Sequence, residues 1–412
     1  AKAAQDYFLL IGPPGTGKTS CALKKMVETF HADKDAQILL LSYTNRAVDE
    51  ICKSLASIAP AVDFIRVGSE LSCDEAYRGH LIENELSSCN RRSEVYERIR
   101  NCRIIVGTVA AISGKPELFR LKHFDVAIID EATQILEPQL LGILCARGED
   151  GKDAIDKFVL IGDHKQLPAV VQQNTEQSAI YDESLLSIGL TNLKDSLFER
   201  LYRNCTATVH RSYDMLCRQG RMHPEVALFA NRAFYGGRLI PVGLPHQIES
   251  SDTICRLAFY PSVPEKAGAS AKINYSEARI VADLAVRIYE DHQTDFDESR
   301  TLGIITPYRS QIALIKKEIE SLGIPALNRI LVDTVERFQG SERDVIIYSF
   351  CVNYPYQLKF LSNLTEEEGV LIDRKLNVAL TRARKQMFIT GVPELLERNP
   401  LYKSLLKLIE SF

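Results

Sequence analysis

The chain has 412 residues, of which 45% are hydrophobic and 25% are charged, and its formal net charge is −4. This length predicts two domains, and the near-neutral charge excludes a general attraction to polyanions, which would need a local basic strip. Ten cysteines without a CxxC pair and eight histidines without metal-ligand spacing argue against a zinc or iron–sulfur site and favour reduced, cytosolic thiols.

Neither a membrane span nor a signal peptide is visible in the sequence, because no apolar run approaches the roughly 18 residues of a span. We therefore expect no membrane partner and a cytoplasmic location. The sequence begins at Ala1, almost directly before a predicted strand. We accordingly expect a piece of a longer chain that carries further domains.

Short apolar runs alternate with helical stretches and predict buried parallel strands. The first set covers residues 7–11, 38–43, 103–108, 126–130 and 158–162, and the second covers 301–306, 330–335, 344–349 and 387–391. A helix is predicted over 309–323. The pattern predicts an α/β protein with two doubly wound parallel-sheet domains, at 1–210 and 211–412. A charged stretch at 69–101 predicts a small helical insertion, and 241–275 an irregular loop.

The stretch IGPPGTGKTS at residues 11–20 predicts a loop that holds phosphate, because it fits G-x-x-x-x-G-K-[ST] between a strand and a helix. Glycines let backbone N–H groups turn toward phosphate oxygens, Lys18 would reach the β- and γ-phosphates, and Thr19 would offer its hydroxyl to Mg²⁺. We expect the nucleotide, ATP, to contact Gly12, Pro14, Gly15, Thr16, Gly17, Lys18, Thr19 and Ser20.

Carboxylates follow the predicted strand in VAIIDEATQ. Asp130 fits a ligand of Mg²⁺ beside Thr19, and Glu131 fits the general base that orients water. Taken alone, such a pair is often a solvated strand end, and the phosphate loop favours the functional interpretation. Gln166, in FVLIGDHKQLPAV, is a candidate sensor of the γ-phosphate, although the neighbouring Asp163 and His164 could simply form a turn.

Hydrolysis needs positive charge on the γ-phosphate, often an arginine from another lobe, which contributes about 10³ to 10⁵ in rate. Arg221, in GRMHPEVALFAN, and Arg382, in LNVALTRARKQ, are the candidates in the second α/β unit. A single arginine is more often a solvated surface charge. If these two do act, closing the lobes on ATP becomes a motor stroke.

The motifs GPPGTGKT, LSYTNRAVDEI, VGTVAAI, IIDEATQ, GDHKQLPAV, GRMHPEVALFAN, ITPYRSQ, VDTVERFQGSERDVII and LNVALTRAR run in order along nearly the whole chain. In this order they resemble a superfamily 1 helicase of the branch that moves 5′ to 3′, which includes the RNA helicase of nonsense-mediated decay and the replication helicase–nuclease.

The resemblance implies two RecA-like lobes with ATP in the cleft between them. It implies that Lys18, Glu131 and Gln166 are catalytic, that Arg221 and Arg382 are arginine fingers, and that Glu342 contacts the nucleotide from the second lobe. It also implies single-stranded DNA or RNA as a partner. The positions that contact the nucleic-acid strand would be Thr44, Asn45, Arg46, Thr108, Tyr308, Arg309 and Thr334. Contacts of this type are made to the sugar–phosphate backbone, so we expect little sequence preference.

The leading hypothesis is an ATP-dependent helicase or translocase stimulated by nucleic acid. One alternative is the ATPase motor fragment of a larger helicase–nuclease, which cannot unwind alone. Another is a nucleic-acid clamp that uses ATP only as a conformational gate, against which Glu131 and the two arginines count. A small-molecule kinase has no evident acceptor pocket in the sequence.

Overall fold

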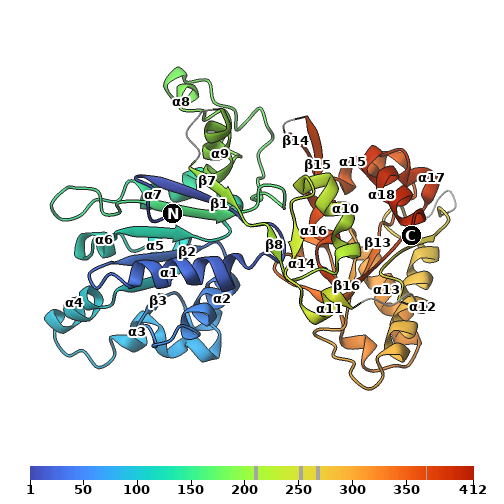
Figure 1. The fold of residues 1–412 in the computed structure, drawn as a ribbon, viewed down its shortest axis with the longest axis horizontal. Helices are drawn as coiled ribbons and strands as arrows, with labels where there is room; N and C mark the ends of the chain where they lie inside the picture. The colour runs from blue at the N-terminus through green and yellow to red at the C-terminus, as the bar shows by residue number, and fades with distance from the viewer. Residues whose placement is uncertain (208–211, 250–253, 266–269, 368) are drawn as a thin grey trace. The chain divides into compact units, whose positions relative to one another are not determined.

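The computed structural model describes residues 1–207, 212–249, 254–265, 270–367 and 369–412. Their contacts form two compact units, and Figure 1 labels the helices and strands of both. The first unit is Ala1–His164 with Pro168–Leu216, and the second is Lys165–Leu167 with Cys217–Phe412. The domain boundary that we expect between residues 210 and 211 lies outside the described residues.

The first unit is built on a parallel sheet of seven strands in the order β3-β4-β2-β5-β6-β1-β7. Parallel strands need crossover connections, which the intervening helices supply. The strands are β1 Tyr7–Ile11, β2 Ile38–Ser42, β3 Ile65–Val67, β4 Ile104–Thr108, β5 Val126–Ile129, β6 Phe158–Gly162 and β7 Tyr213–Met215.

Both faces of the first sheet are buried, because alternate side chains of each strand enter different cores. Leu9 and Leu39 pack into one core with α5, α6, α7 and α9, while Leu10 and Leu40 pack into the other with α1 and α2. The longer helices of this unit are α1 Lys24–His31, α2 Asn45–Ala56, α4 Arg92–Asn101, α5 Val109–Ser113, α6 Glu117–Leu121, α7 Glu137–Leu144, α8 Glu183–Ser187 and α9 Leu197–Ala207.

Short helical turns complete the first unit. They are the π-helix η1 Lys18–Leu23, the 3₁₀ turns η2 Glu70–Ser72, η3 Glu75–His80 and η4 Ala132–Gln134, and the short helix α3 Ile82–Glu85. The stretch expected to form a helical insertion thus contains η2, η3, α3 and α4.

The second unit is built on a parallel sheet of five strands in the order β10-β16-β13-β11-β12. An antiparallel hairpin, β14-β15, and a short parallel pair, β8-β9, stand beside it. The strands are β8 Arg218–Gln219, β9 Ile240–Pro241, β10 Leu257–Pro261, β11 Leu302–Ile305, β12 Leu331–Asp333, β13 Arg343–Ser349, β14 Leu364–Glu367, β15 Val370–Asp373 and β16 Ala383–Gly391.

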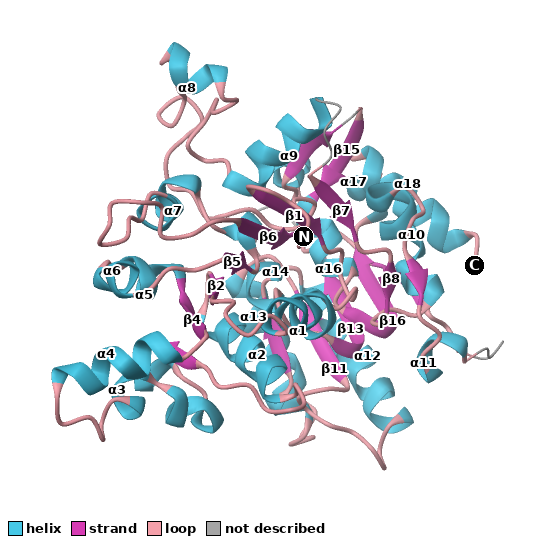
Figure 2. Cartoon of the chain, turned by 60° about the vertical axis from the view of Figure 1, so that its left-hand side comes forward, coloured by secondary structure: helices cyan, strands magenta, loops and turns pink. Residues whose placement is uncertain are grey.

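Helices α12 and α13 cover one face of the second sheet, where their apolar side chains meet Ile304, Ile347 and Phe388. Figure 2 shows the strands in magenta and the helices in cyan. The helices of this unit are α10 Pro224–Tyr235, α11 Pro245–Ile248, α12 Tyr275–Asp291, α13 Arg309–Ser321, η5 Leu327–Arg329, α14 Val335–Phe338, η6 Pro355–Gln357, α15 Leu358–Leu361, α16 Arg374–Leu380, α17 Pro393–Leu396 and α18 Pro400–Glu410.

The predicted α/β class with two parallel-sheet units is confirmed, and each predicted strand is present within a residue or two, except that β16 begins four residues earlier. The sequence did not predict β3, β7, β8, β9, β10, β14 and β15. These strands are short, or they carry a charged residue or a proline, as β3 carries Arg66 and β7 carries Asp214. The expectation of an irregular loop over 241–275 is wrong where α11 and β10 form. Among the described residues, none of the helices combines the length and apolar composition that a bilayer crossing demands.

Candidate functional site

The predicted phosphate loop follows β1 and needs glycine at three positions. A Cβ on Gly12 would lie 2.0 Å from Cγ of Lys18, because the lysine side chain folds over it and Nζ donates to the Gly12 carbonyl at 2.8 Å. Gly15 and Gly17 have φ angles of +74° and +72°, a left-handed region that other residues rarely adopt. The chain thus turns tightly into η1, with Lys18 held at its start.

Thr19 and Asp130 meet although 111 residues separate them in sequence, since the Thr19 hydroxyl donates to Asp130 Oδ2 at 2.5 Å. Asp130 directly follows β5 and is 1% exposed, and its Oδ1 accepts the Glu131 backbone N–H at 2.9 Å. The strand end therefore presents a buried carboxylate to the first turn after the phosphate loop, as the sequence predicts.

Burial raises the pKa of Asp130 to about 6, and the neighbouring charge of Glu131 adds to this rise, which Thr19 and Lys18 only partly offset. The ionised carboxylate therefore has too few nearby positive charges to balance its own charge and that of Glu131. A hydroxyl beside a carboxylate is the oxygen donor set that Mg²⁺ takes, together with phosphate oxygens and water. The residues present thus fit the metal that the sequence implies.

Glu131 sits in a strained backbone position, with a φ of +54° in the left-handed region. The strain turns the chain from β5 directly into η4, and there Glu131 Oε2 accepts the amide of Gln134 at 2.9 Å. Strained residues of this type concentrate at functional sites, where the surrounding structure holds them in place. The two adjacent carboxylates therefore have different surroundings. Asp130 is buried and accepts a hydrogen bond from Thr19, whereas Glu131 is oriented by the Gln134 amide.

In the second unit, Arg221 is held by a carboxylate and a carbonyl. Its Nε donates to Glu342 Oε2 at 2.5 Å, and it also donates to the Thr381 carbonyl at 3.2 Å. The Nε atom of Arg384 lies 3.7 Å from Oε1, the other carboxylate oxygen of Glu342. Burial raises the pKa of Glu342, but the charges of Arg221, Arg384 and Arg382 outweigh burial and leave this pKa below its usual value.

Arg382 lies just before β16, is 2% exposed and is held from both sides. Its Nε donates to the Val378 carbonyl at 3.0 Å, and one terminal nitrogen donates to Gln166 Oε1 at 3.2 Å. The segment Lys165–Leu167 belongs by its contacts to the second unit. The candidate sensor Gln166 therefore touches one candidate arginine finger directly.

Four of the predicted strand-contacting residues occupy the same local position, the residue that caps a helix after a parallel strand. Thr44 and Thr108 accept the backbone N–H groups of Ala47 and Ala111. Thr44 follows β2 and Thr108 is the last residue of β4, and these two strands are paired neighbours. In the second unit, the capping residues Tyr308 and Thr334 follow β11 and β12, also neighbours.

Asn45, Arg46 and Arg309 occupy the first turns of these helices, and Arg46 and Arg309 are exposed. Within each unit the fold therefore brings the predicted strand-contacting residues to one edge of one sheet.

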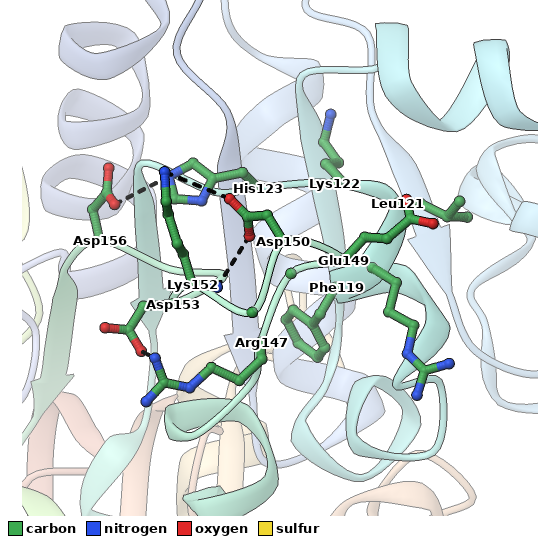
Figure 3. Close-up of a pocket in the computed structure, with 13 residues that line it drawn as sticks. Phe119, Leu121, Lys122, His123, Arg147, Glu149, Asp150, Lys152, Asp153 and Asp156 are labelled. Atoms are coloured by element: carbon green, nitrogen blue, oxygen red, sulfur yellow. Dashed lines mark hydrogen bonds and ion pairs between the residues drawn. The ribbon is translucent and has the colours of Figure 1, made fainter.

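A pocket of about 900 Å³ in the first unit lies at the opposite edge of the sheet, near the amino ends of β5 and β6. Figure 3 shows three pairs among its charged side chains: His123 with Asp156 at 3.0 Å, Lys152 with Asp150 at 3.7 Å, and Arg147 with Asp153. None of the predicted site residues lines it. Exposed pairs of this type contribute little to stability.

Sequence reasoning missed the partners that hold these groups. Gln134 orients Glu131, while Arg384 and Thr381 help to hold Glu342 and Arg221. Arg384 had one weak signal, since it stands two residues after Arg382 at the start of a strand. Gln134 and Thr381 lie within the motifs IIDEATQ and LNVALTRAR, but no role was assigned to them, because a side-chain amide or a carbonyl is too common to single out.

Comparison with known proteins places nearly the whole chain beside known helicases. Two family models, each described as an AAA domain, match residues 1–94 with 82–174 and residues 193–394. The chain is 31% identical over 411 residues to the DNA replication ATP-dependent helicase/nuclease DNA2 of Gallus gallus, across 98% of this chain. It is 25% identical to the DNA polymerase alpha-associated DNA helicase A of Saccharomyces cerevisiae, across 95% of this chain.

The chain belongs to the superfamily 1 helicases. This confirms the family resemblance of its motifs, including the likeness to the replication helicase–nuclease group. This helicase chain spans 36% of the Gallus gallus relative and 63% of the yeast relative. A solved structure of an arterivirus nonstructural protein 10 helicase with DNA aligns with a TM-score of 0.48 at 14% identity, over 97% of this chain and 63% of that one.

Proposed function

We propose that this chain is an ATP-dependent motor that translocates on single-stranded nucleic acid and unwinds duplexes in the 5′-to-3′ direction. The observation that carries the proposal is the contact between Thr19 and Asp130, at 2.5 Å, beside Lys18 and Glu131. A phosphate loop and two strand-end carboxylates so arranged suit cleavage of a nucleoside triphosphate.

Each group of the first unit has a separate task in this proposal. The backbone of Gly15 and Gly17 cradles the phosphates, and Lys18 leaves the Gly12 carbonyl to neutralise phosphate charge. Thr19 and Asp130 would hold Mg²⁺, which would supply positive charge to offset that of the phosphates. Glu131 accepts a proton from the attacking water, and the Gln134 amide keeps its carboxylate oriented.

The second unit contributes positive charge to the same reaction. Arg221 and Arg382 stabilise the charge on the transferred phosphoryl group, each worth about 10³ to 10⁵ in rate. Glu342 holds Arg221 ready for this role, and its proposed contact with the nucleotide would be through the oxygen shared with Arg384. Gln166 reports the nucleotide state by its bond to Arg382.

The capping residues after β2, β4, β11 and β12 are proposed to grip phosphate and sugar along the strand, with DNA or RNA as the polymer. Because the chain spans about a third of its DNA2 relative, further domains of the same protein are proposed partners. The ten cysteines, none of which forms a disulfide among the described residues, suit the reducing conditions of a cytoplasmic location.

ATP hydrolysis measured with and without poly(dT) or poly(U) tests the proposal. Strong stimulation by either polymer is expected, because strand binding and lobe closure are coupled in a motor. No stimulation would contradict the motor and favour a clamp that binds ATP without turnover.

Unwinding of tailed duplexes then separates the helicase from a motor fragment. We expect ATP-dependent separation of duplexes with a 5′ single-stranded tail. Stimulated hydrolysis without separation would instead favour the ATPase fragment of a larger helicase–nuclease. Duplexes of DNA and of RNA, compared side by side, identify the polymer.

A further inference from the structure

Exposed aromatic rings follow β13 in the second unit, in a segment that no motif covers. Residues 354–361, comprising η6 and α15 with the residue before them, carry Tyr354, Tyr356 and Phe360 (Figure 1). Tyr356 is 54% exposed and Phe360 is 69% exposed. Large aromatic side chains exposed together on a soluble protein indicate a contact surface.

The ring of Tyr356 is supported from behind. The rings of Tyr354 and Tyr356 are stacked, with centroids 5.7 Å apart and planes inclined by 14°. One ring already backed by another, with more than half of its residue exposed, can accept a further flat ring on its open side. Bases of a single strand are flat rings, and they stack on protein aromatics without regard to sequence.

The segment is rigid because a buried glutamine fastens it to Tyr308. Gln357 is 2% exposed, and its Oε1 accepts the backbone N–H groups of Asn353 and Tyr354, each at 2.9 Å. Its amide donates to the Ala271 carbonyl at 2.7 Å and to the Tyr308 hydroxyl at 3.2 Å. All hydrogen-bonding positions of this amide are thereby used, which fixes the loop in advance of any ligand.

A second layer of buried amides supports the first. Asn274 donates to Asn353 Oδ1 at 2.9 Å, and Asn274 and Gln311 are joined by two backbone–side chain bonds of 2.8 and 3.0 Å. Gln311 lies in the first turn of α13, the helix that Tyr308 caps. The aromatic segment and the predicted strand-contacting residue are therefore parts of one fixed structure.

Position and charge favour a nucleic-acid strand over a protein as the occupant. The segment leaves β13 at the same sheet edge where Tyr308 and Thr334 leave β11 and β12. Lys359 within the segment and Arg309 after Tyr308 are exposed cations on this edge. Rings that alternate with cations are how proteins hold single strands without reading their sequence.

We propose that Tyr356 and Phe360 form a base-stacking platform that extends the strand path of the second unit beyond Tyr308. The inference rests on the proposed function and adds to it a contact with bases, where the predicted residues contact backbone. Tyr354 is a positioning residue behind Tyr356, and Gln357 positions the whole segment against Tyr308.

Fluorescence anisotropy with a labelled deoxythymidine oligomer, and with an abasic oligomer of equal length, tests the platform. Tyr356→Ala and Phe360→Ala should each weaken binding of the deoxythymidine oligomer by about five- to 150-fold, the range for one lost stack. They should change the affinity for the abasic oligomer far less, because it has no bases to stack. Tyr356→Trp should retain the wild-type affinity.

Two further variants separate this inference from the proposed function. Arg309→Ala should weaken both oligomers equally, because it removes charge from the backbone contact. Leu322→Ala, which shortens an exposed side chain at the far end of α13, should change neither.

An unchanged affinity of the Tyr356 and Phe360 variants, with the Arg309 effect present, would overturn the platform alone and leave the exposed rings to a protein partner. Equal losses on both oligomers would also overturn it, since stacking cannot act on an abasic strand. Failure of the wild type to bind either oligomer would overturn the strand contacts of the proposed function, and the platform with them.

Discussion

The two units present their charged groups at different edges of their sheets. In the first unit the phosphate loop and Asp130 follow the carboxyl ends of β1 and β5. In the second unit Glu342 and Arg382 directly precede β13 and β16, at the amino ends, while the predicted strand contacts follow the carboxyl ends. Two sheets of the same class thus use opposite edges for groups that we assign to one reaction.

The difference extends to electrostatics. Asp130 is buried next to another carboxylate, so its pKa is raised to about 6. Glu342 is surrounded by arginines, which keep its pKa below the usual range despite burial. The carboxylates of the first unit therefore favour binding of a cation. In the second unit the Glu342 carboxylate holds the arginines in place. The comparison teaches that the sheet edge alone does not identify a site, whereas the local balance of charge does.

The largest effect is expected from the second unit. Arg382→Ala should lower kcat for strand-stimulated ATP hydrolysis by about 10³ to 10⁵, with little change in ATP affinity, because the charge acts on the transition state. Steady-state kinetics with a separate ATP-binding measurement checks this. Arg398→Ala, which removes an exposed arginine of the same unit, is the control and should have no effect. Equal losses in kcat and affinity would contradict the finger assignment.

In the first unit, Glu131→Gln should lower kcat by about 10² to 10⁴ and leave ATP binding intact. The substitution keeps the size of the side chain and removes only the base, while the phosphate loop is untouched. Glu117→Gln, at an exposed glutamate of α6, serves as the matched control. Turnover that persists in the Glu131 variant would contradict its role as the base.

Stability should respond to pH in opposite ways at the two carboxylates. Asp130 has a folded pKa of about 6 against a reference value of 3.8, so the folded state holds this proton more tightly than the unfolded state. The ionised Asp130 carboxylate therefore destabilises the folded state. This destabilisation is absent well below pH 3.8, grows between pH 3.8 and about 6, and is complete above that range.

Asp130→Asn removes this destabilisation and should raise the free energy of unfolding at pH 8 by about 1 to 3 kcal/mol. The gain should vanish near pH 4, as urea unfolding at both pH values would show. A gain that is the same at both pH values would contradict the burial argument.

Glu342→Gln should have the smallest effect and the opposite sign. Because the folded pKa of Glu342 lies below its reference value of 4.5, its contribution is present above that pH and is lost as pH falls through the lowered value. The side chain is 42% exposed, so the loss at pH 7 should be about 0.5 kcal/mol. Chemical denaturation at pH 7 and pH 3 checks it, and a variant more stable than wild type at pH 7 would contradict the ion pair.

The sequence predicts those features that depend on local rules. Strands buried on both faces appear as continuous apolar runs, and Gly15 and Gly17 stand where the loop needs a positive φ, which other residues rarely adopt. The pairing of Thr19 with Asp130 was also predictable, since each motif ends a strand of the same sheet. Edge strands such as β3 and β10 were not predictable, because β3 has only three residues with Arg66 at its centre, and β10 is only partly buried and ends in Pro261.

Other features depend on which distant residues the fold brings together. The contact of Arg221 with Glu342 spans 121 residues, and that of Gln166 with Arg382 spans 216. Gln357 gives no signal in the sequence, because a single glutamine in a turn is unremarkable until its four hydrogen bonds are seen. Such networks follow from the packing of the whole unit and not from any local pattern.

The most direct test of the account is phosphate release at saturating poly(dT) or poly(U), compared among the wild type, Lys18→Ala and Arg382→Ala. Either substitution alone, one in each unit, should abolish stimulated turnover while both variants remain folded, as circular dichroism would show. Full turnover in the Arg382 variant, with Lys18→Ala inactive, would mean that the first unit hydrolyses ATP unaided and would contradict the shared reaction.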